Sequence, residues 1–216
     1  MTTPDSVKEL LESNNFGDRL RGVNHLRQLD PAIAYDLIKP SVTDENVRVR
    51  YAAVSQLASL GEQNRSESLS LLKAALFDPE PDVQAAAADS IGGLHLTEAY
   101  EDLEKLYQRT PEWLVRFSIV AALGELGDAR GYDLLADALN SESDLVITAA
   151  IGSLGELGDD RAVPLLIPYA TSPDWQIRHR VAQALGQLKT PEAKAALETL
   201  ANDEMEQVAE LAKSAL

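Results

Sequence analysis

A short leucine-rich segment returns along the chain every 31 to 34 residues, and few folds accommodate such a period. The segment reads Leu-Gly-Glu-Leu at 123–126 and again at 154–157, and it reads Leu-Gly-Gln-Leu at 185–188. A fixed period of this length indicates a repeat protein in which each unit is one small supersecondary structure. Seven units cover the 216 residues, and the recurring segment begins in them at Leu26, Leu57, Ile91, Leu123, Leu154, Leu185 and Leu216.

Each unit is predicted to form two helices. The second helix carries apolar residues at positions i, i+4, i+8 and i+11, which lie along one stripe of a helix. In the fourth unit this stripe is Val115, Ile119, Leu123 and Leu126. Gly127 follows directly, where a glycine readily adopts the left-handed conformation that ends a helix. No segment shows the alternation of a strand, so the chain is predicted to be all-α.

The predicted helices form hairpins that stack. The first helices are predicted at 4–13, 31–39, 66–77, 97–109, 129–140, 161–171 and 191–202. The second helices are predicted at 17–29, 46–60, 81–94, 112–126, 143–157, 174–188 and 204–216. One hairpin cannot bury its apolar stripe alone, whereas stacked hairpins bury a continuous core. We therefore predict an α-solenoid, a right-handed superhelix of about seven hairpins with the second helices on its concave side, as a single domain over residues 1–216. The three extra residues near 62–65 are expected to lengthen a loop.

Composition excludes several classes of function. The 19 Lys and Arg against 35 Asp and Glu leave a net charge of −16, which argues against nucleic acid as a partner. The absence of cysteine excludes disulfides, zinc–thiolate sites and thiol nucleophiles. With no apolar run long enough to span a membrane and no signal peptide, the chain is expected to be cytoplasmic without membrane insertion. Residues 78–160 hold 18 acids and four bases, either as solvated helix faces or as an acidic band that steers partners.

Catalytic and metal-binding motifs are not found in the sequence. The three histidines, His25, His95 and His179, are not paired on one helix face with another His or Glu, so no metal site is predicted. No phosphate-binding loop or nucleophile motif appears, and no catalytic residue is assigned. One arginine recurs near the start of several second helices. We interpret these arginines as an internal ladder that pairs with acids or carbonyls between repeats, the alternative being a clamp for a ligand carboxylate. They are Arg19, Arg50, Arg116 and Arg178.

The second helices also carry apolar residues where water is expected. At 100° per residue, positions i−1, i+2, i+6 and i+10 face away from the apolar stripe. In the sixth unit they are polar, namely Gln176, His179, Gln183 and Gln187. In units two to five they include Tyr51, Ala85, Leu114, Phe117, Ala121, Leu145, Thr148 and Gly152. An exposed apolar patch often marks a binding groove, although packing between repeats is the alternative. Trp113 and Trp175, which open their helices, are expected to pack between repeats rather than to line this groove.

Two segments resemble a known family. Residues 174–188, DWQIRHRVAQALGQL, and 154–166, LGELGDDRAVPLL, resemble the HEAT-like repeat of phycobilisome lyases. Residues 46–61 and the divergent N-terminal units are most similar to the NblB family of phycobilisome degradation proteins. The resemblance implies a HEAT-like solenoid that docks on phycobiliprotein subunits and assists detachment of their bilin. It carries over no catalytic residue, and whether the protein is an enzyme stays open. A bilin lyase subunit and a generic HEAT-repeat scaffold for a protein partner are the alternatives, and a homo- or heterodimer is possible.

The resemblance and the apolar positions together suggest a groove for a pigment or partner. Without cysteine, the chain can hold a linear tetrapyrrole only noncovalently. Carboxylates such as Asp89, Glu125 or Glu156 are expected to accept hydrogen bonds from pyrrole N–H groups, and His179 or Arg180 to meet a propionate. The predicted groove is lined by Tyr51, Asp89, Leu114, Phe117, Ala121, Glu125, Leu145, Thr148, Glu156, His179 and Arg180.

Overall fold

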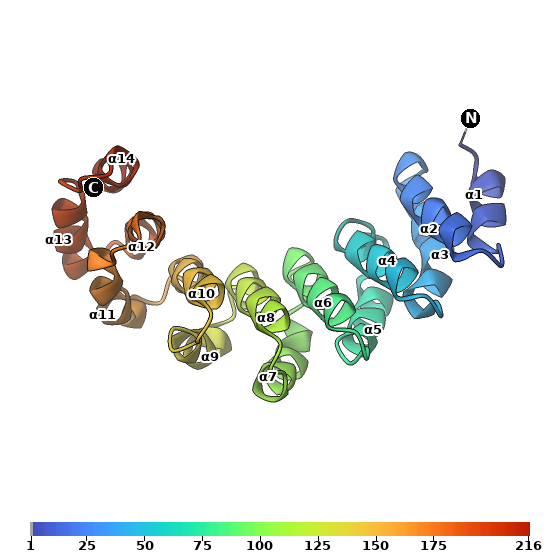
Figure 1. Ribbon diagram of the computed structural model, residues 1–216, viewed down its shortest axis with the longest axis horizontal. Coiled ribbons are helices and arrows are strands. Elements are labelled where there is room, and N and C mark those ends of the chain that lie inside the picture. The colour runs from blue at the N-terminus through green and yellow to red at the C-terminus, as the bar shows by residue number, and fades with distance from the viewer. Residues whose placement is uncertain (1) are drawn as a thin grey trace. The chain divides into compact units, whose positions relative to one another are not determined.

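The computed structural model describes residues 2–216, and every regular element among them is a helix (Figure 1). The first helices of the hairpins are α1 (Pro4–Leu11), α3 (Pro31–Ile38), α5 (Arg65–Ala75), α7 (Tyr100–Arg109), α9 (Tyr132–Ala138), α11 (Val163–Leu166) and α13 (Pro191–Leu200). The second helices are α2 (Phe16–His25), α4 (Val47–Leu60), α6 (Pro81–Gly93), α8 (Trp113–Leu126), α10 (Asp144–Leu157), α12 (Trp175–Leu188) and α14 (Glu206–Ala215). The predicted all-α solenoid of helical hairpins is confirmed.

Short 3₁₀ turns directly precede or follow several of the helices. They are η1 (Leu26–Gln28), η2 (Lys39–Thr43), η3 (Gly61–Asn64), η4 (Thr97–Ala99), η5 (Ala129–Gly131), η6 (Asp160–Ala162) and η7 (Ile167–Thr171). The loop predicted near 62–65 is therefore wrong, because η3 leads directly into α5. The Asn64 side chain caps α5 by accepting a hydrogen bond from the backbone N–H of Glu67.

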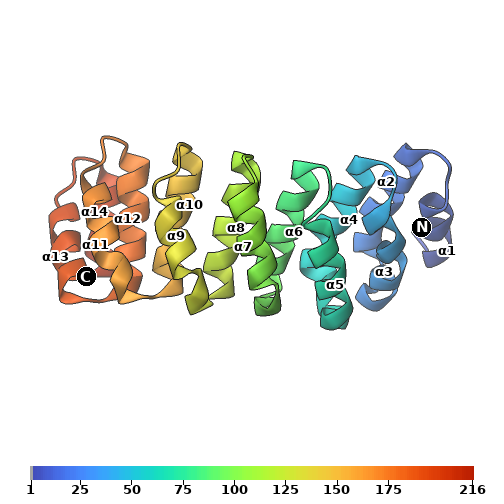
Figure 2. The ribbon, with the colours of Figure 1, turned by 90° about the horizontal axis from the view of Figure 1, so that it is seen from below.

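The chain forms two compact units, residues 1–122 and 123–216, and the boundary falls within α8. In the first unit, α2, α4 and α6 form one layer, and α3, α5 and α7 form the other (Figures 1 and 2). In the second unit, α10, α12 and α14 pack successively against one another, with α9, α11 and α13 behind them (Figure 2). Both units use the same hairpin, since each hairpin buries its stripe only against its neighbours.

Hydrogen bonds from buried polar side chains tie neighbouring second helices together within the first unit. The Ser90 hydroxyl on α6 donates to the Val54 carbonyl on α4 over 2.9 Å. Gln56 Nε2 on α4 donates to the Val23 carbonyl on α2 over 2.8 Å. Both side chains are buried. Because a buried polar group without a partner is costly, these contacts favour one register between adjacent helices.

The predicted arginine ladder is confirmed for three of the four arginines, each of which pairs with an aspartate of the next hairpin. Arg178 donates from Nε to Asp203 Oδ2 over 2.7 Å and from Nη2 to Oδ1 over 2.8 Å, and both side chains are only 8% exposed. Arg116 differs, since its Nε donates to the Thr110 carbonyl and its guanidinium lies 5.3 Å from the Tyr107 ring centre. The three bidentate pairs are Arg19–Asp44, Arg50–Asp78 and Arg178–Asp203.

The ladder makes stability depend on pH. The Arg178 hydrogen bond, helped by the Met205 backbone N–H, holds the pKa of Asp203 below its usual value. Burial alone would raise the pKa of Asp44, but hydrogen bonds from Arg19 and the Asn46 backbone outweigh it and lower the pKa. A lowered folded-state pKa stabilises the fold fully above the unfolded value of about 3.9 and loses that effect as pH falls through the folded value.

Acid titration should reveal this contribution. We expect the urea midpoint to stay nearly level between about pH 7 and pH 5 with respect to these groups and to fall below about pH 4. Urea unfolding followed by circular dichroism at several pH values measures the change. The Asp203→Asn variant lacks one of the two titrations, so its midpoint should fall less steeply below pH 4. An equally steep fall would show that Asp203 contributes nothing to acid sensitivity.

Candidate functional site

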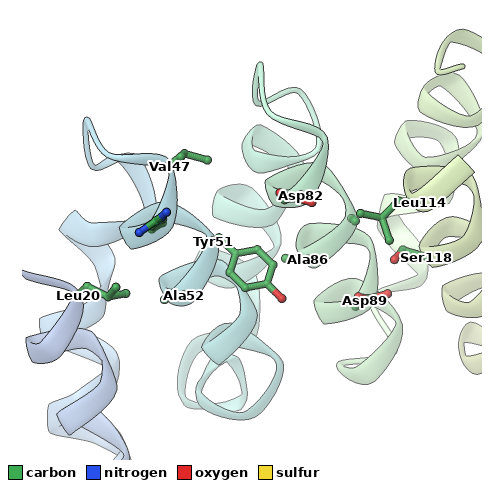
Figure 3. A pocket seen from close by; sticks show the side chains of 11 residues that line it. Leu20, Val47, Tyr51, Ala52, Asp82, Ala86, Asp89, Leu114 and Ser118 are labelled. Carbon is green, nitrogen blue, oxygen red and sulfur yellow. The ribbon is translucent and has the colours of Figure 1, made fainter. Parts of the chain in front are cut away.

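The first unit contains an open pocket of about 650 Å³ on the exposed side of its second helices (Figure 3). Its residues come from α2, α4, α6 and α8, one after another along the layer. A pocket of this size and mixed lining is within the range that small-molecule ligands occupy. The lining residues are Leu20, Val47, Arg48, Tyr51, Ala52, Asp82, Ala85, Ala86, Asp89, Leu114 and Ser118.

The hollow arises from a difference in side-chain size between three neighbouring helices. The α6 side chains at the centre are Ala85 and Ala86, which are buried and make a low floor. Tyr51 reaches from α4 toward α6, and Leu114 extends from α8 on the other side (Figure 3). Tyr51 keeps 48% of its surface exposed, so its ring is available to a ligand. An apolar floor between an aromatic and an aliphatic wall favours a flat, largely apolar molecule.

The charged side chains that line the pocket differ in their hydrogen-bond and ion-pair partners. Burial raises the pKa of Asp89, and a hydrogen bond from the Ser118 hydroxyl opposes that rise. The Asp89 side chain is exposed at the pocket and has the Ser118 hydroxyl as its side-chain partner. Arg48 also lines the pocket, and among the described residues its guanidinium has no carboxylate within ion-pair distance. The pocket therefore offers one cation, Arg48, and two carboxylates, Asp82 and Asp89, on an apolar background.

Three of the eleven residues predicted for the groove meet in this pocket. Tyr51, Asp89 and Leu114 line it. Phe117 and Ala121, further along α8, are half-buried and are not among its lining residues. The contribution of each of these five residues to binding stays a prediction.

The other predicted groove residues lie in the second unit. Leu145 is 54% exposed near the start of α10, and Glu125 and Glu156 are exposed near the ends of α8 and α10. Thr148 is half-buried and donates its hydroxyl to the Asp144 carbonyl over 2.7 Å. These residues are on helix faces that solvent reaches, and their role in binding stays a prediction as well.

Arg180 and His179 are both half-buried on α12. Arg180 lies against Gly152 of α10, where an added Cβ would come within 3.3 Å of the arginine Cδ. Its Nη1 donates to Gln183 Oε1 over 3.1 Å. The His179 ring packs edge-on against Trp175, with 6.4 Å between ring centres. These contacts hold both side chains at the exposed side of α12.

The expectation that the tryptophans pack between repeats is wrong. Trp113 is 49% exposed and Trp175 is 37% exposed. Each is the first residue of its helix, α8 or α12. At the first helical position the preceding turn is absent, so a large ring projects past the helix end instead of entering the contact between hairpins. Neither tryptophan lines the pocket of the first unit.

Positional reasoning missed part of the pocket. Arg48 and Asp82 occupy the i−1 position that faces away from the stripe, so the positional rule includes them, but polar residues are expected there in any solvated helix. Ala52, Ala86 and Ser118 occupy position i+3, which the rule leaves out. They line the pocket because the large side chains on either side of it are widely spaced. The side of each helix next to the hollow is therefore accessible, as well as the residues that point directly away from the stripe.

Among residues 2–216, no three His, Cys, Asp or Glu side chains are grouped so that they would hold a metal ion. None of the helices in that part of the chain combines the length and the hydrophobicity that a bilayer crossing requires.

Known protein families whose repeats are described as HEAT repeats match this chain, in agreement with its helical-hairpin repeat. The family described as HEAT repeats matches residues 68–154 and 135–216, which is more than half of the chain. The family described as PBS lyase HEAT-like repeat matches residues 49–78, a range that includes Tyr51 of the pocket. The uncharacterized phycocyanin operon protein Z of Pseudanabaena tenuis is 30% identical over 139 residues, which cover 62% of this chain and 68% of that protein.

Solved structures share the fold at lower identity. A chain in the complex of CpcE and CpcF of phycocyanin lyase from Nostoc sp. PCC7120 matches with a TM-score of 0.67 and 22% identity, covering 100% of this chain and 96% of its own. The Escherichia coli protein YibA matches with a TM-score of 0.74 and 19% identity, covering 98% of this chain and 79% of its own. At these identities the structures support the fold alone. The family matches and the operon protein show more: the chain belongs to the HEAT-like phycobilisome lyase family.

Proposed function

We propose that this protein docks on phycobiliprotein subunits and holds their bilin noncovalently while the chromophore is detached from the antenna. The observation that carries the proposal is the pocket of the first unit, whose alanine floor lies between Tyr51 and Leu114. Membership of the phycobilisome lyase family supports phycobiliproteins as the partners. The lack of cysteine supports noncovalent binding, since no thiol is present to form a thioether.

The pocket chemistry suits a linear tetrapyrrole. Such a pigment has a flat conjugated body, pyrrole N–H donors and two propionates. The body would lie on the floor of Ala85 and Ala86 with the Tyr51 ring against one side. Arg48 would meet one propionate, because a guanidinium binds a carboxylate through two parallel hydrogen bonds. Asp89 would accept from pyrrole N–H groups. The conjugated body of the pigment would thus contact the apolar floor, and its polar groups would contact the charged side chains at the edge of the pocket.

A bilin lyase subunit is the second candidate. The match of residues 49–78 to the PBS lyase HEAT-like repeat favours it, because that description names a lyase. A lyase subunit would deliver the pigment to an apoprotein, whereas the degradation role would remove it. Both require the same pocket. Incubation with holo-phycocyanin and with its apoprotein separates them, since removal releases pigment from the first and attachment adds it to the second.

The proposed pocket can be tested by pigment titration. We expect free phycocyanobilin to change its absorption spectrum when mixed with the wild-type protein. The Leu114→Asp variant should weaken binding by about tenfold or more, because a carboxylate in the pocket wall must lose water when the apolar pigment binds. Leu114 is only half-buried, so the variant should keep the helical circular dichroism spectrum.

A matched variant controls for charge alone. Ile33→Asp makes the equivalent substitution at an exposed apolar residue of α3, a helix that contributes no residue to the pocket lining, and should leave pigment binding unchanged. Unaltered binding by Leu114→Asp would contradict the assignment of the pocket. If phycocyanin bound without any pigment response, the protein would instead be a scaffold for a protein partner.

A further inference from the structure

Asp89 differs from the ladder aspartates in having no cationic partner. No Lys, Arg or His side chain in residues 2–216 forms an ion pair with Asp89, whose side chain is hydrogen-bonded to the Ser118 hydroxyl. Asp44, Asp78 and Asp203, by contrast, each receive a bidentate arginine. A carboxylate that lines an apolar pocket without a counter-charge loses part of its hydration and gains no ion pair. This arrangement leaves room for a positive charge brought by a ligand.

The surroundings of Asp89 define where that charge must lie. On its own helix, Asp82 is seven residues earlier, about two turns away along the pocket. From α4, Arg48 and Tyr51 line the same pocket, and from α8, Ser118 and the apolar Leu114 complete it (Figure 3). Arg48 forms no ion pair with Asp89 and is free to meet an anionic group elsewhere on the ligand. The pocket therefore combines sites for opposite charges with an apolar floor between helices.

We propose that Asp89 is the residue that selects the cationic, protonated form of the tetrapyrrole and positions its nitrogens over the alanine floor. This inference rests on the proposed function, because it concerns the ligand assigned to the same pocket. The physical reason is that the neutral pigment offers Asp89 only hydrogen bonds, whereas the protonated pigment also supplies the counter-charge that Asp89 lacks. Ser118, which hydrogen bonds the carboxyl, orients it and is a positioning residue.

The proposed role of Asp89 predicts that binding of the pigment depends on pH. A carboxylate beside the bound pigment raises the pKa of the pigment's protonated nitrogen, so the pigment stays protonated to a higher pH in the complex than in water. Binding strengthens as pH falls toward the pigment's pKa and weakens again once Asp89 itself is protonated. Affinity therefore passes through a maximum between the two pKa values.

The experiment is a pH titration of the pigment's absorption spectrum in the full-length protein. Phycocyanobilin is bound at saturating protein, and the long-wavelength band of the protonated pigment is followed from about pH 5 to pH 9. We expect Asp89→Asn to lower the midpoint of that band by about one to three pH units relative to wild type, the range by which one opposite charge shifts a neighbouring pKa. Asp89→Glu keeps the carboxylate and should keep most of the raised midpoint.

A second aspartate of the same pocket provides the matched control. Asp82→Asn removes a carboxylate from the same helix and should move the midpoint by much less than Asp89→Asn. Binding by Asp89→Asn with an unchanged midpoint would overturn the role of Asp89 and leave the proposed function standing. An equal shift in the two variants would also overturn it, because the effect would then be one of pocket charge in general. If the wild-type protein did not bind the pigment, the proposed function would fail and this inference with it.

Discussion

Replacing Asp203 with alanine is expected to lower the free energy of unfolding by about 2–3 kcal/mol, because it leaves the Arg178 guanidinium without its main partner. The two side chains are 8% exposed, and water therefore cannot replace the lost hydrogen bonds fully. The same substitution removes the acceptor of the Met205 backbone N–H, 2.8 Å away. Urea unfolding followed by circular dichroism at 222 nm would measure the change.

The neighbouring residue is a close control. Glu204 also approaches Arg178, at 3.5 Å, but its side chain is 85% exposed. An exposed ion pair contributes at most about 1 kcal/mol, so Glu204→Ala should leave stability almost unchanged. If the two variants destabilised the protein equally, the ladder would act through net charge and not through the buried bidentate contact. The Asp203→Asn variant, which keeps the shape of the side chain, should fall between them.

Substituting Gly155 with alanine should destabilise the second unit by roughly 1–3 kcal/mol, although alanine is the better helix former. A Cβ at this position would lie 2.6 Å from the Cα and 2.7 Å from the Cβ of Ala184. The obstructing atoms belong partly to the backbone of α12, which cannot rotate away as a flexible side chain does. We expect α10 and α12 to move apart and lose dispersion contacts along their shared surface.

Gly93 tests the opposite case on the last turn of α6. There the nearest atom to an added Cβ is the Ala58 Cβ at 3.9 Å, an ordinary contact. Gly93→Ala should therefore be neutral or stabilising, by up to about 1 kcal/mol, since only the gain in helix propensity remains. The two variants are compared by thermal unfolding at one protein concentration. A stabilised Gly155→Ala protein would show that the close approach of α10 and α12 is not needed.

The repeat made the helices predictable with small errors at their ends. The predicted second helix 81–94 agrees closely with α6 (Pro81–Gly93), because its stripe and its starting proline are local signals. The segment 161–171 is less regular, since η6, the short α11 and η7 share it. Pro164 and Pro168 explain the difference, because a proline removes a backbone donor and crowds the preceding turn.

The candidate site was predictable only in outline. The rule that marks positions opposite the stripe places Tyr51, Asp89 and Leu114 on the accessible side, and all three line the pocket. It does not distinguish them from Phe117, which has the same kind of position but lies outside the pocket lining. The depth of the pocket depends on the sizes of side chains on three adjacent helices. A positional rule applied to one helix at a time does not compare them.

The all-α repeat, the stripe that each helix buries and the positions of the ladder arginines can be read from the amino-acid sequence. These features follow from spacings of three, four and about 31 residues, which act within a helix or between adjacent hairpins. The packing of several helices, by contrast, sets which residues form a hollow, which tryptophans stay exposed and which aspartates of the pocket lack a counter-charge. Those properties depend on distances between side chains of several helices at once, and periodicity along the chain does not specify them.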